Sequence, residues 1–495
     1  MVRRDQTLKT RYRAIVSYTG LVWAMAGLVM FGPLFGLPAA PSEVHLLPWF
    51  LLPGTVLSVG GMLLWKVSRP QQSVTLGVRD GGVIVLLSWI TVFVFSAVPF
   101  MGIQDFTFTQ AVFESVSGWT TTGLTVVDES AAPALILLWR SIMQLAGGAG
   151  LAIIMVAALV GPTGPGLYAA EGRSQLVPHV RQSAKLVVVL YAGYALLGVA
   201  GYWAAGMTFF DAVNHSFAAV STGGFSTHPD SIGHWNSALI ESVSIPLMLL
   251  GNFNFVTVYV LVRGKVKSFI RNGEMRLLLV LIVACSAGLF AATAALYPTF
   301  GKGIRVAIFE TVTAITTTGF SSTSYNSWDA VPFLVLIVLM VIGGGTCSTA
   351  GGIKQHRVYL LLRGLWSRLR APFLPDNTVT RELIWEGDRK SYITDARLRE
   401  VGMFVFLYLM VWTVGTLVLA AHGNGLQSSL FEFASAVGTV GLSTGLTSAD
   451  SPVLVLWTET AGMFLGRLEF FIILVSLGKL AGDAFHVLAA GKRQR

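Results

Sequence analysis

Long apolar stretches, separated by shorter polar connections, run through the whole chain. Residues 83–99, 186–205, 277–296 and 403–421 are examples, and they approach the roughly 20 apolar residues that cross a bilayer as a helix. Hydropathy and the alternation of charge together predict ten helices, near residues 13–36, 47–66, 81–101, 133–160, 184–205, 238–263, 275–297, 329–364, 400–421 and 453–487. The pattern therefore predicts an all-α polytopic membrane protein with ten transmembrane helices.

Lysine and arginine are distributed unevenly between the connections. Residues 102–137, 206–237 and 421–455 contain neither, whereas the connections between them and both chain ends are basic. Because cytoplasmic loops carry the excess of Lys and Arg, both termini are predicted to lie in the cytoplasm, with the chain in a plasma membrane. The net charge of +9 therefore indicates topology and contact with membrane lipid, and no nucleic-acid partner is expected.

Composition narrows the class of protein further. Charged residues make up 12% of the chain, against roughly 25% in soluble domains, which excludes an ordinary soluble protein. The two cysteines, Cys285 and Cys347, both lie in apolar or glycine-rich membrane segments. A disulfide framework is therefore excluded.

Four segments in the outer connections repeat one another. Each has a glycine followed by an apolar residue and then Ser or Thr, with a Thr two positions before the glycine; the glycines are Gly123, Gly224, Gly319 and Gly441. Nine positions before these glycines stand Glu114, His215, Glu310 and Glu432. The last eight helices therefore form four pseudo-repeated helix–pore-loop–helix units around one pore, preceded by two N-terminal helices.

The repeats divide the chain into six parts. They are an N-terminal helix pair (1–72), repeat one (73–165), repeat two (166–268), repeat three (269–370), a cytoplasmic linker (371–398) and repeat four (399–495).

The repeated segments suit the binding of a bare monovalent cation. Such an ion needs a ring of oxygens in place of its water, and an extended Thr-x-Gly stretch can turn successive carbonyls inward. The predicted potassium-binding residues are Thr121, Thr122, Gly123, Thr222, Gly223, Gly224, Thr317, Thr318, Gly319, Thr439, Val440 and Gly441. A packing seam of small residues is the alternative. The glutamates nine positions earlier are predicted to lie near the starts of short helices, where an acidic side chain complements the helix dipole. A direct ion site at these glutamates is the less favoured alternative.

Together these residues resemble the superfamily of potassium transporters built from four potassium-channel-like repeats, and within it the TrkH/TrkG branch. Residues 138–148, 251–255, 343–354 and 466–469 carry the resemblance outside the repeats. It implies a homodimer, a cytosolic ring of nucleotide-binding TrkA-type RCK domains as partner, potassium as substrate and no cofactor bound by the chain itself. Cys347 departs from the family, since many relatives have glycine there. Gly223 and Val440 also replace the Thr of repeats one and three.

A glycine-rich stretch interrupts the predicted helix 329–364. Each glycine in a helix interior costs about 1 kcal/mol, so five of them predict an unwound intramembrane loop. The predicted gate residues are Gly343, Gly344, Gly345, Thr346, Ser348, Thr349, Gly351 and Gly352. A kink of small packed residues is the alternative.

Two arginines lie within apolar helices. An arginine at membrane depth is costly unless it is paired or hydrated, which makes Arg467 a functional candidate. The resemblance implies that Arg467 projects into the pore as an electrostatic barrier, whereas a structural pair with Glu469 or another helix is the alternative. Arg140 lies nearer the outer end of its helix and is expected to tie helices together or to snorkel.

The predicted function is potassium uptake across the plasma membrane, without enzymatic activity. A sodium-selective or non-selective cation transporter is the alternative, although all four glycines favour potassium. A polytopic membrane enzyme is a remote alternative, because the eight histidines are scattered and no HExxH motif occurs. Whether flux is passive or coupled to protons or sodium is left open.

Overall fold

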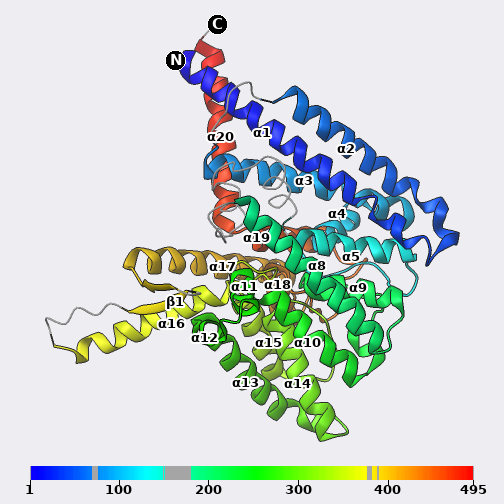
Figure 1. Cartoon of the computed structure of the whole chain (residues 1–495), viewed down its shortest axis with the longest axis vertical. Helices are drawn as coiled ribbons and strands as arrows, with labels where there is room; N and C mark the ends of the chain where they lie inside the picture. The colour runs from blue at the N-terminus through cyan, green and yellow to red at the C-terminus, as the bar shows by residue number, and fades with distance from the viewer. Residues whose placement is uncertain are drawn as a thin grey trace. The chain divides into compact units, whose positions relative to one another are not determined.

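The computed structural model describes residues 2–69, 76–148, 150, 180–375, 382–386 and 389–493. The chain divides into two compact units (Figure 1). The first unit consists of Met1–Trp119, Ala132–Tyr191 and Leu468–Arg495, and the second of Thr120–Ala131 and Ala192–Arg467. Almost all regular structure in the described residues is helical.

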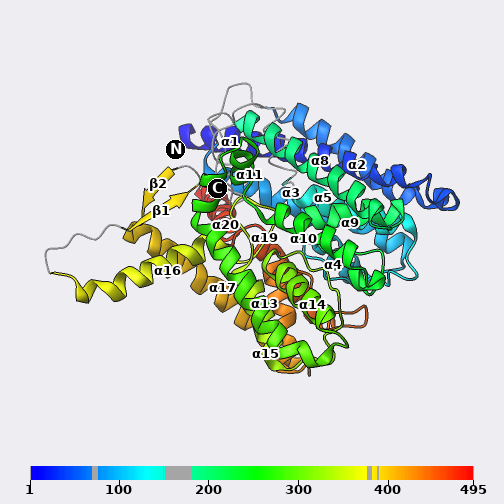
Figure 2. The same cartoon turned by 60° about the horizontal axis from the view of Figure 1, so that its bottom comes forward.

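The first unit is built on long apolar helices that pack closely. Its helices are α1 (Val2–Val29), α2 (Pro48–Val67), α3 (Val78–Ile103), α4 (Phe108–Trp119), α5 (Ala134–Gly148), α20 (Phe470–Arg493) and the beginning of α8 (Val180–Ala204). Helices α1 and α2 lie side by side in both views (Figures 1 and 2). Glycines permit this approach, since a Cβ at Gly61 would collide with the backbone of Gly20 and Ala24.

The second unit holds most of the outer connections and the segments between them. Besides the end of α8 it contains α9 (Phe209–Val220), α10 (Ala238–Asn252), α11 (Phe255–Val262), α12 (Val266–Arg271), α13 (Gly273–Thr293), α14 (Phe300–Ile315), α15 (Ala330–Ile342), α16 (Gln355–Arg370), α17 (Asp395–Ala421), α18 (Leu426–Gly438) and α19 (Val453–Arg467). Helices α13, α14 and α15 lie side by side (Figures 1 and 2). Leu336, Leu339 and Met340 of α15 join Phe431 of α18 in one buried apolar core.

Four helices end immediately before the four repeated segments. These helices are α4, α9, α14 and α18. Threonine side chains begin two of them, because Thr208 Oγ1 accepts from the amide of Asp211 (3.1 Å) and Thr299 Oγ1 from that of Lys302 (3.2 Å). Helices α9, α14 and α18 end where the backbone turns into the left-handed region at Thr222, Thr317 and Thr439. Each of these short helices therefore delivers the chain directly into a repeated segment.

Many of the helices are apolar enough to cross a membrane. Among the described residues, six single helices meet that requirement: Leu8–Gly36, Pro48–Val67, Arg79–Ile103, Val187–Ala204, Gly273–Leu296 and Asp395–Ala421. The pair α19 and α20 meets it together, and α5, α10 and α15 are shorter apolar helices. These helices fall in the predicted ranges, while the count of ten spans stays a prediction.

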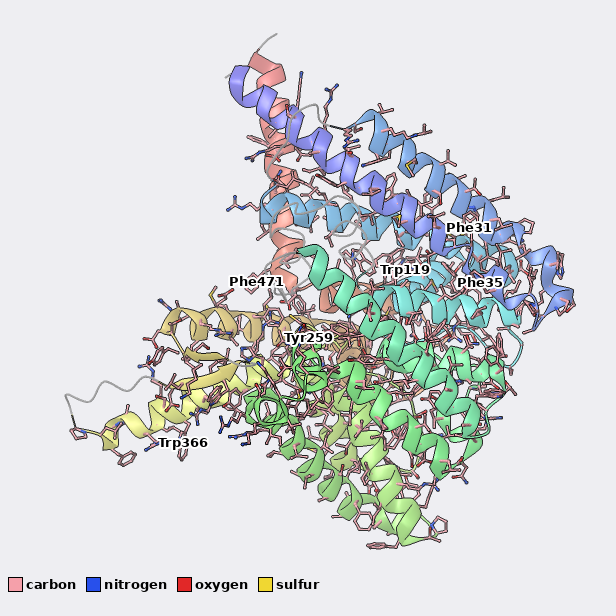
Figure 3. The ribbon with its side chains drawn as sticks, in the orientation of Figure 1. Phe31, Phe35, Trp119, Tyr259, Trp366 and Phe471 are labelled. Carbon is pink, nitrogen blue, oxygen red and sulfur yellow. The ribbon has the colours of Figure 1, made fainter. Side chains whose placement is uncertain are left out.

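Large apolar side chains on the surface fit a lipid-facing protein. Phe35 in the first unit is 88% exposed, whereas Trp119 in the same unit is buried and donates from Nε1 to Ser96 Oγ (Figure 3). In the second unit, α13 and α17 expose leucine, valine, methionine and phenylalanine side chains along their length. Such surfaces are tolerated where lipid takes the place of water.

Within the described residues, three predicted helices are broken, and one of these breaks was expected. The glycine-rich stretch separates α15 from α16, as predicted. The predicted helix 238–263 is interrupted at Phe253 and Asn254, and the predicted helix 453–487 at Leu468 and Glu469, where Glu469 has a φ of 62°. The interruption at Phe253 and Asn254 comes directly after Asn252, whose side chain accepts a hydrogen bond from the glycine-rich stretch.

The predicted linker contains a structure that helical periodicity does not indicate. Strands β1 (Leu383–Glu386) and β2 (Arg389–Tyr392) form an antiparallel pair, in which Ile384 is buried against Leu360 of α16 and Val401 of α17. The described residues are thus mostly helical, with one pair of short strands. The predicted boundaries at residues 72 and 165 lie outside the described residues.

Candidate functional site

The four repeat glycines form a closed ring within the second unit. All four have positive φ, with values of 96°, 74°, 84° and 95° for Gly123, Gly224, Gly319 and Gly441. A Cβ built on any of them would collide with the carbonyl oxygen that precedes the next glycine, in the order Gly223, Thr318, Val440 and Thr122. The contacts therefore run from repeat one to two, three, four and back to one. Glycine is required at these positions by both conformation and space.

The threonines two positions before the glycines share an uncommon conformation. Thr121, Thr222, Thr317 and Thr439 have φ values of 56°, 53°, 53° and 50°. A β-branched residue rarely adopts a left-handed backbone, and four equivalent occurrences indicate a common constraint. The four threonines are fully buried.

Two of these threonine hydroxyls have no protein partner. In the part of the chain that the structure describes, no hydrogen-bonding group reaches Thr121 Oγ1 or Thr439 Oγ1, although both atoms are buried. A buried hydroxyl without a partner is costly, because it has lost its water. Buried hydroxyl oxygens such as these two suit a desolvated cation, which needs oxygen atoms in place of its water.

The residues nine positions before the glycines brace the chain that follows the ring. Glu310 accepts from the amide and hydroxyl of Ser322 (2.8 and 2.9 Å) and from the Tyr325 hydroxyl (2.6 Å). Glu432 binds the corresponding segment of repeat four, and His215 Nε2 lies 3.0 Å from Ser226 Oγ. The expectation that these glutamates sit near helix starts is wrong. They lie well inside their helices, and those of repeats three and four bond the returning chain.

An outer cavity of about 200 Å³ opens onto the glycine ring. Its lining includes all four glycines, the hydroxyl residues Ser226, Ser321, Ser443 and Thr447, and the ionisable residues Glu129 and His228. His228 stacks on His234 with ring centroids 3.8 Å apart. Burial lowers the pKa of His228 and the neighbouring His234 adds to this effect, while Asp211 opposes it. The pKa of His228 therefore lies below the ordinary value of histidine.

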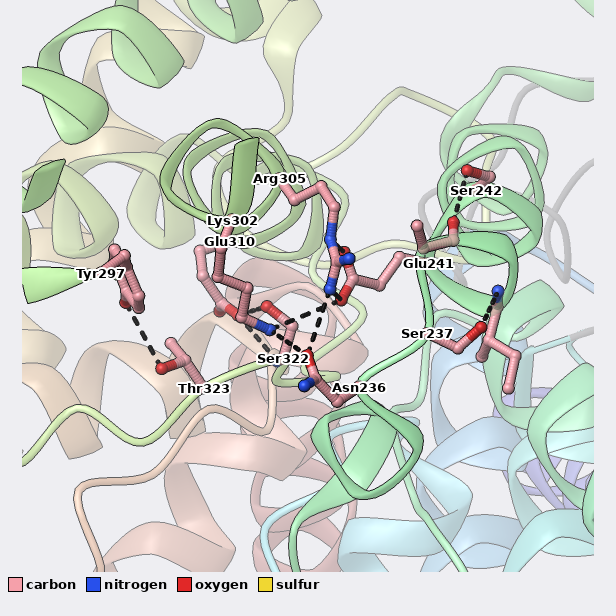
Figure 4. A network of polar contacts seen from close by, with 12 residues as sticks. Asn236, Ser237, Glu241, Ser242, Tyr297, Lys302, Arg305, Glu310, Ser322 and Thr323 are labelled. Carbon is pink, nitrogen blue, oxygen red and sulfur yellow. Dashed lines mark hydrogen bonds and ion pairs between the residues drawn. The ribbon is translucent and has the colours of Figure 1, made fainter. Parts of the chain in front are cut away.

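Two basic residues, Lys302 and Arg305, contact the carboxylate of Glu241. Arg305 of α14 forms a bidentate pair with Glu241 of α10, with both N–O distances 2.9 Å (Figure 4). Asn236 Oδ1 accepts from Lys302 Nζ (2.7 Å) and from Arg305 Nη2 (3.2 Å). This network joins repeats two and three and offsets part of the positive charge of Lys302 and Arg305.

The glycine-rich loop is held by polar groups of the neighbouring helices. Asn252 Oδ1 accepts from the amide of Gly345 (2.9 Å) and Glu274 Oε1 from that of Thr346 (2.7 Å). The loop also folds on itself, since the amide of Gly344 donates to the Gly351 carbonyl (3.0 Å). These bonds replace the helical bonds that the five glycines and Cys347, with a φ of 55°, do not sustain.

The same loop contacts the threonines below the glycine ring. Thr349 Oγ1 lies 3.0 Å from Thr222 Oγ1, and the amide of Gly351 donates to Thr317 Oγ1 (2.7 Å). A Cβ at Gly351 would collide with Thr439 Oγ1. The loop therefore closes against three of the four repeats.

The loop hydroxyls are turned to protein in this conformation. Ser348 Oγ donates to the Gly345 carbonyl (2.6 Å) and Thr349 Oγ1 to the Gly251 carbonyl (2.9 Å). Thr346 Oγ1 is buried and contacts no hydrogen-bonding group of the described residues.

Arg467 lies at the end of α19 and reaches this loop. Its Nη1 donates to the carbonyl oxygen of Thr349. The guanidinium therefore binds the glycine-rich loop itself. One residue of repeat four is therefore tied to the loop of repeat three.

Arg140 ties helices together, as expected. Its Nε lies 2.8 Å from Glu114 Oε1, and both side chains are buried within the first unit. The glutamate of the repeated register in α4 thus pairs with an arginine of α5.

A sequence model of the TrkH family, described as a cation transport protein, matches residues 54–485. This chain belongs to the TrkH family. The TrkH potassium uptake protein of Halomonas elongata is 33% identical over 439 residues, covering 85% of this chain and 89% of that protein. The TrkG potassium uptake protein of Escherichia coli is 32% identical over 453 residues, covering 88% and 91%. The resemblance to the TrkH/TrkG branch is confirmed.

A solved structure agrees with these relatives. The crystal structure of the potassium transporter TrkH from Vibrio parahaemolyticus superposes with a TM-score of 0.82 at 28% identity, covering 94% of this chain and 98% of that one. Membership of a transport family, together with the apolar helices, identifies a multi-pass membrane protein and disfavours the enzyme alternative.

Sequence reasoning missed several residues of this TrkH-family site. Glu274 and Thr447 were not singled out, and Asn252 was named only within the segment 251–255 that carries the resemblance, although each is buried and bonds one of the candidate segments. An acid directly before the predicted apolar helix 275–297 was an available signal for Glu274. Among the described residues, no group of three or more His, Cys, Asp or Glu side chains is arranged to hold a tightly bound metal ion.

Proposed function

We propose that this protein takes up potassium across a bacterial inner membrane through a pore formed by its four repeats. The ring that closes from Gly123 through Gly224, Gly319 and Gly441 carries the proposal. Its carbonyl oxygens, with the buried threonine hydroxyls beneath, supply the kind of oxygen cage that replaces the hydration shell of a monovalent cation. The names of the relatives, potassium uptake proteins and a potassium transporter, support the choice of ion.

The finer assignments belong to the same proposal. The residues from Thr121 to Gly123 and their counterparts in the other repeats form the selectivity filter, and residues 343–352 form the gate beneath it. The contacts of the gate with Thr222 and Thr317 support this arrangement, since movement of the loop would expose the inner threonines. Both termini lie in the cytoplasm, and the functional unit is a homodimer with a cytosolic TrkA-type RCK ring. The names of the relatives support a subunit of a Trk system.

Rubidium uptake into proteoliposomes tests the function. Rubidium should enter liposomes that contain the purified protein, and external potassium should suppress its entry more strongly than sodium or lithium. Equal competition by sodium would support the alternative of a sodium or non-selective cation transporter. Absence of uptake, both alone and with a TrkA-type partner, would contradict the transport proposal.

Replacing Arg467 by alanine should raise the rate of rubidium uptake. The guanidinium adds a positive charge near the gate and binds the Thr349 carbonyl, so the substitution removes both a barrier to cations and a bond that holds the loop closed. The initial uptake rate per protein molecule measures the effect.

Two further variants control this prediction. Arg467→Lys retains the charge and should give a smaller increase. Arg399→Ala removes an exposed arginine from the cytoplasmic end of α17 and should leave uptake unchanged. Unchanged or lower uptake by Arg467→Ala at normal protein levels would exclude the barrier.

A further inference from the structure

A pair of buried glutamates lies behind the repeat-four segment of the ring. Glu432 belongs to α18 and Glu459 to α19, and neither side chain is exposed. One residue of the connecting segment, Thr447, bridges them, because its Oγ1 lies 2.7 Å from Glu432 Oε1 and 3.0 Å from Glu459 Oε1. Two carboxyl groups thus share one hydroxyl away from solvent.

Counting hydrogen atoms shows that this cluster needs an additional proton. A hydroxyl group has a single hydrogen to donate, so Thr447 can satisfy only one of the two carboxyl oxygens. If both glutamates were ionised, the other oxygen–oxygen contact would hold no hydrogen and would be repulsive. A second hydrogen must therefore lie on one of the carboxyl groups.

The surroundings show which glutamate is ionised. Glu432 accepts from five donors, which are the hydroxyls of Ser443, Thr444 and Thr447 and the amides of Thr444 and Thr447. Such a set of donors stabilises a carboxylate. Glu432 therefore holds the negative charge of the pair.

Glu459 has the opposite environment. Its Oε1 contacts Thr447, and within the described part of the chain its buried Oε2 has no hydrogen-bonding partner. An uncompensated buried charge costs several kcal/mol, whereas a neutral carboxylic acid can donate to Thr447 without that penalty.

The elements packed around Glu459 offer it no basic partner. Of the helices in contact with α19, α18 has only Glu432 as a charged residue, and α17 has none between Glu400 and His422, where Tyr408 is the one other titratable group. The segment between α18 and α19 carries only the exposed Asp450. Arg467, two turns further along α19, binds the Thr349 carbonyl.

We propose that Glu459 is a proton-binding site, in which its carboxylic acid donates to Thr447 and Thr447 donates to the Glu432 carboxylate. Thr447 also lines the outer cavity above the glycine ring, so the proton has a route to the outer solution through this hydroxyl. The proton can also pass to Glu432 without change of net charge, when Thr447 receives the hydrogen of Glu459 as it gives its own to Glu432.

Binding or loss of the proton at Glu459 would affect the glycine ring. Glu432 holds Ser443 and Thr444, which lie two and three positions after Gly441. Loss of the proton places a second negative charge behind this segment, and that charge has no partner. This inference goes beyond the proposed function and does not depend on which cation is transported.

Infrared spectroscopy of the purified protein tests the site. A protonated carboxylic acid has a C=O stretching band well separated from that of a carboxylate, and the band shifts in D₂O. At neutral pH, Glu459→Gln should lose one such band relative to the wild-type protein. The matched substitution Glu400→Gln, at an exposed position of α17, should leave all such bands in place.

A second variant covers the case in which Glu459→Gln does not fold, as judged by gel filtration. Thr447→Val keeps the acid but removes the acceptor of its O–H group, so the C=O band of this acid should shift in frequency relative to the wild-type protein. An unchanged spectrum in either folded variant would overturn the proposal. Failure of rubidium uptake would contradict the transport function and leave this spectral result intact.

Discussion

Replacing Gly319 by alanine should abolish potassium-selective rubidium uptake. A Cβ at this position would collide with the carbonyl oxygen of Val440 and would lie 3.0 Å from the Cα of Gly441. The φ of 84° adds backbone strain for any residue with a side chain. Because the backbone of the next repeat is the obstacle, no side-chain rotation relieves the overlap. Proteoliposome uptake with potassium and sodium as competitors measures the loss.

A matched glycine in the same repeat provides the control. Gly301 lies in α14, has nothing within 4 Å of a built Cβ, and is exposed. Gly301→Ala should therefore retain wild-type uptake, since alanine is favoured over glycine in a helix. A wild-type rate and competition profile for Gly319→Ala would contradict a role of this glycine in the filter.

Replacing Arg140 by methionine should destabilise the protein by about 3–5 kcal/mol. The substitution leaves the Glu114 carboxylate buried without its Arg140 partner, and the cost of an uncompensated buried charge exceeds the usual cost of a lost hydrogen bond. A lower midpoint of thermal unfolding in detergent is the expected observation.

The double substitution Glu114→Gln with Arg140→Met should recover part of that loss, because it removes both charges. Arg79→Met, at an exposed position of the same unit, should change the midpoint little. Equal midpoints for Arg140→Met and Arg79→Met would mean that the buried pair contributes nothing to stability.

The repeated register is visible in the sequence because it is local and occurs four times. The alignment of Gly123 with its three counterparts needs only counting, and the five glycines from Gly343 to Gly352 predict a break by propensity alone. The positions that the repeats share could therefore be predicted from the sequence alone. Their assignment to a filter is part of the proposal.

The parts that were missed depend on contacts between distant residues. The break after Asn252 is stabilised by a bond to Gly345, 93 positions away, and no local pattern encodes it. The glutamates of the register were assigned to helix starts because the helix bounds were unknown, whereas Glu310 bonds Ser322 across the turn of the chain. Helical periodicity also gives no sign of the β1–β2 pair, whose stability rests on Ile384 packing between α16 and α17.

The bonds between the glycine-rich loop and the inner threonines have a consequence for protein engineering. Thr222 and Thr317 belong to repeats two and three, yet each is hydrogen-bonded to the loop of repeat three. A chimera that takes only this loop from a relative would place the hydroxyls of Thr222 and Thr317 against loop residues of another sequence. The loop and the threonines that it contacts should therefore be exchanged together, although their residues lie far apart along the chain.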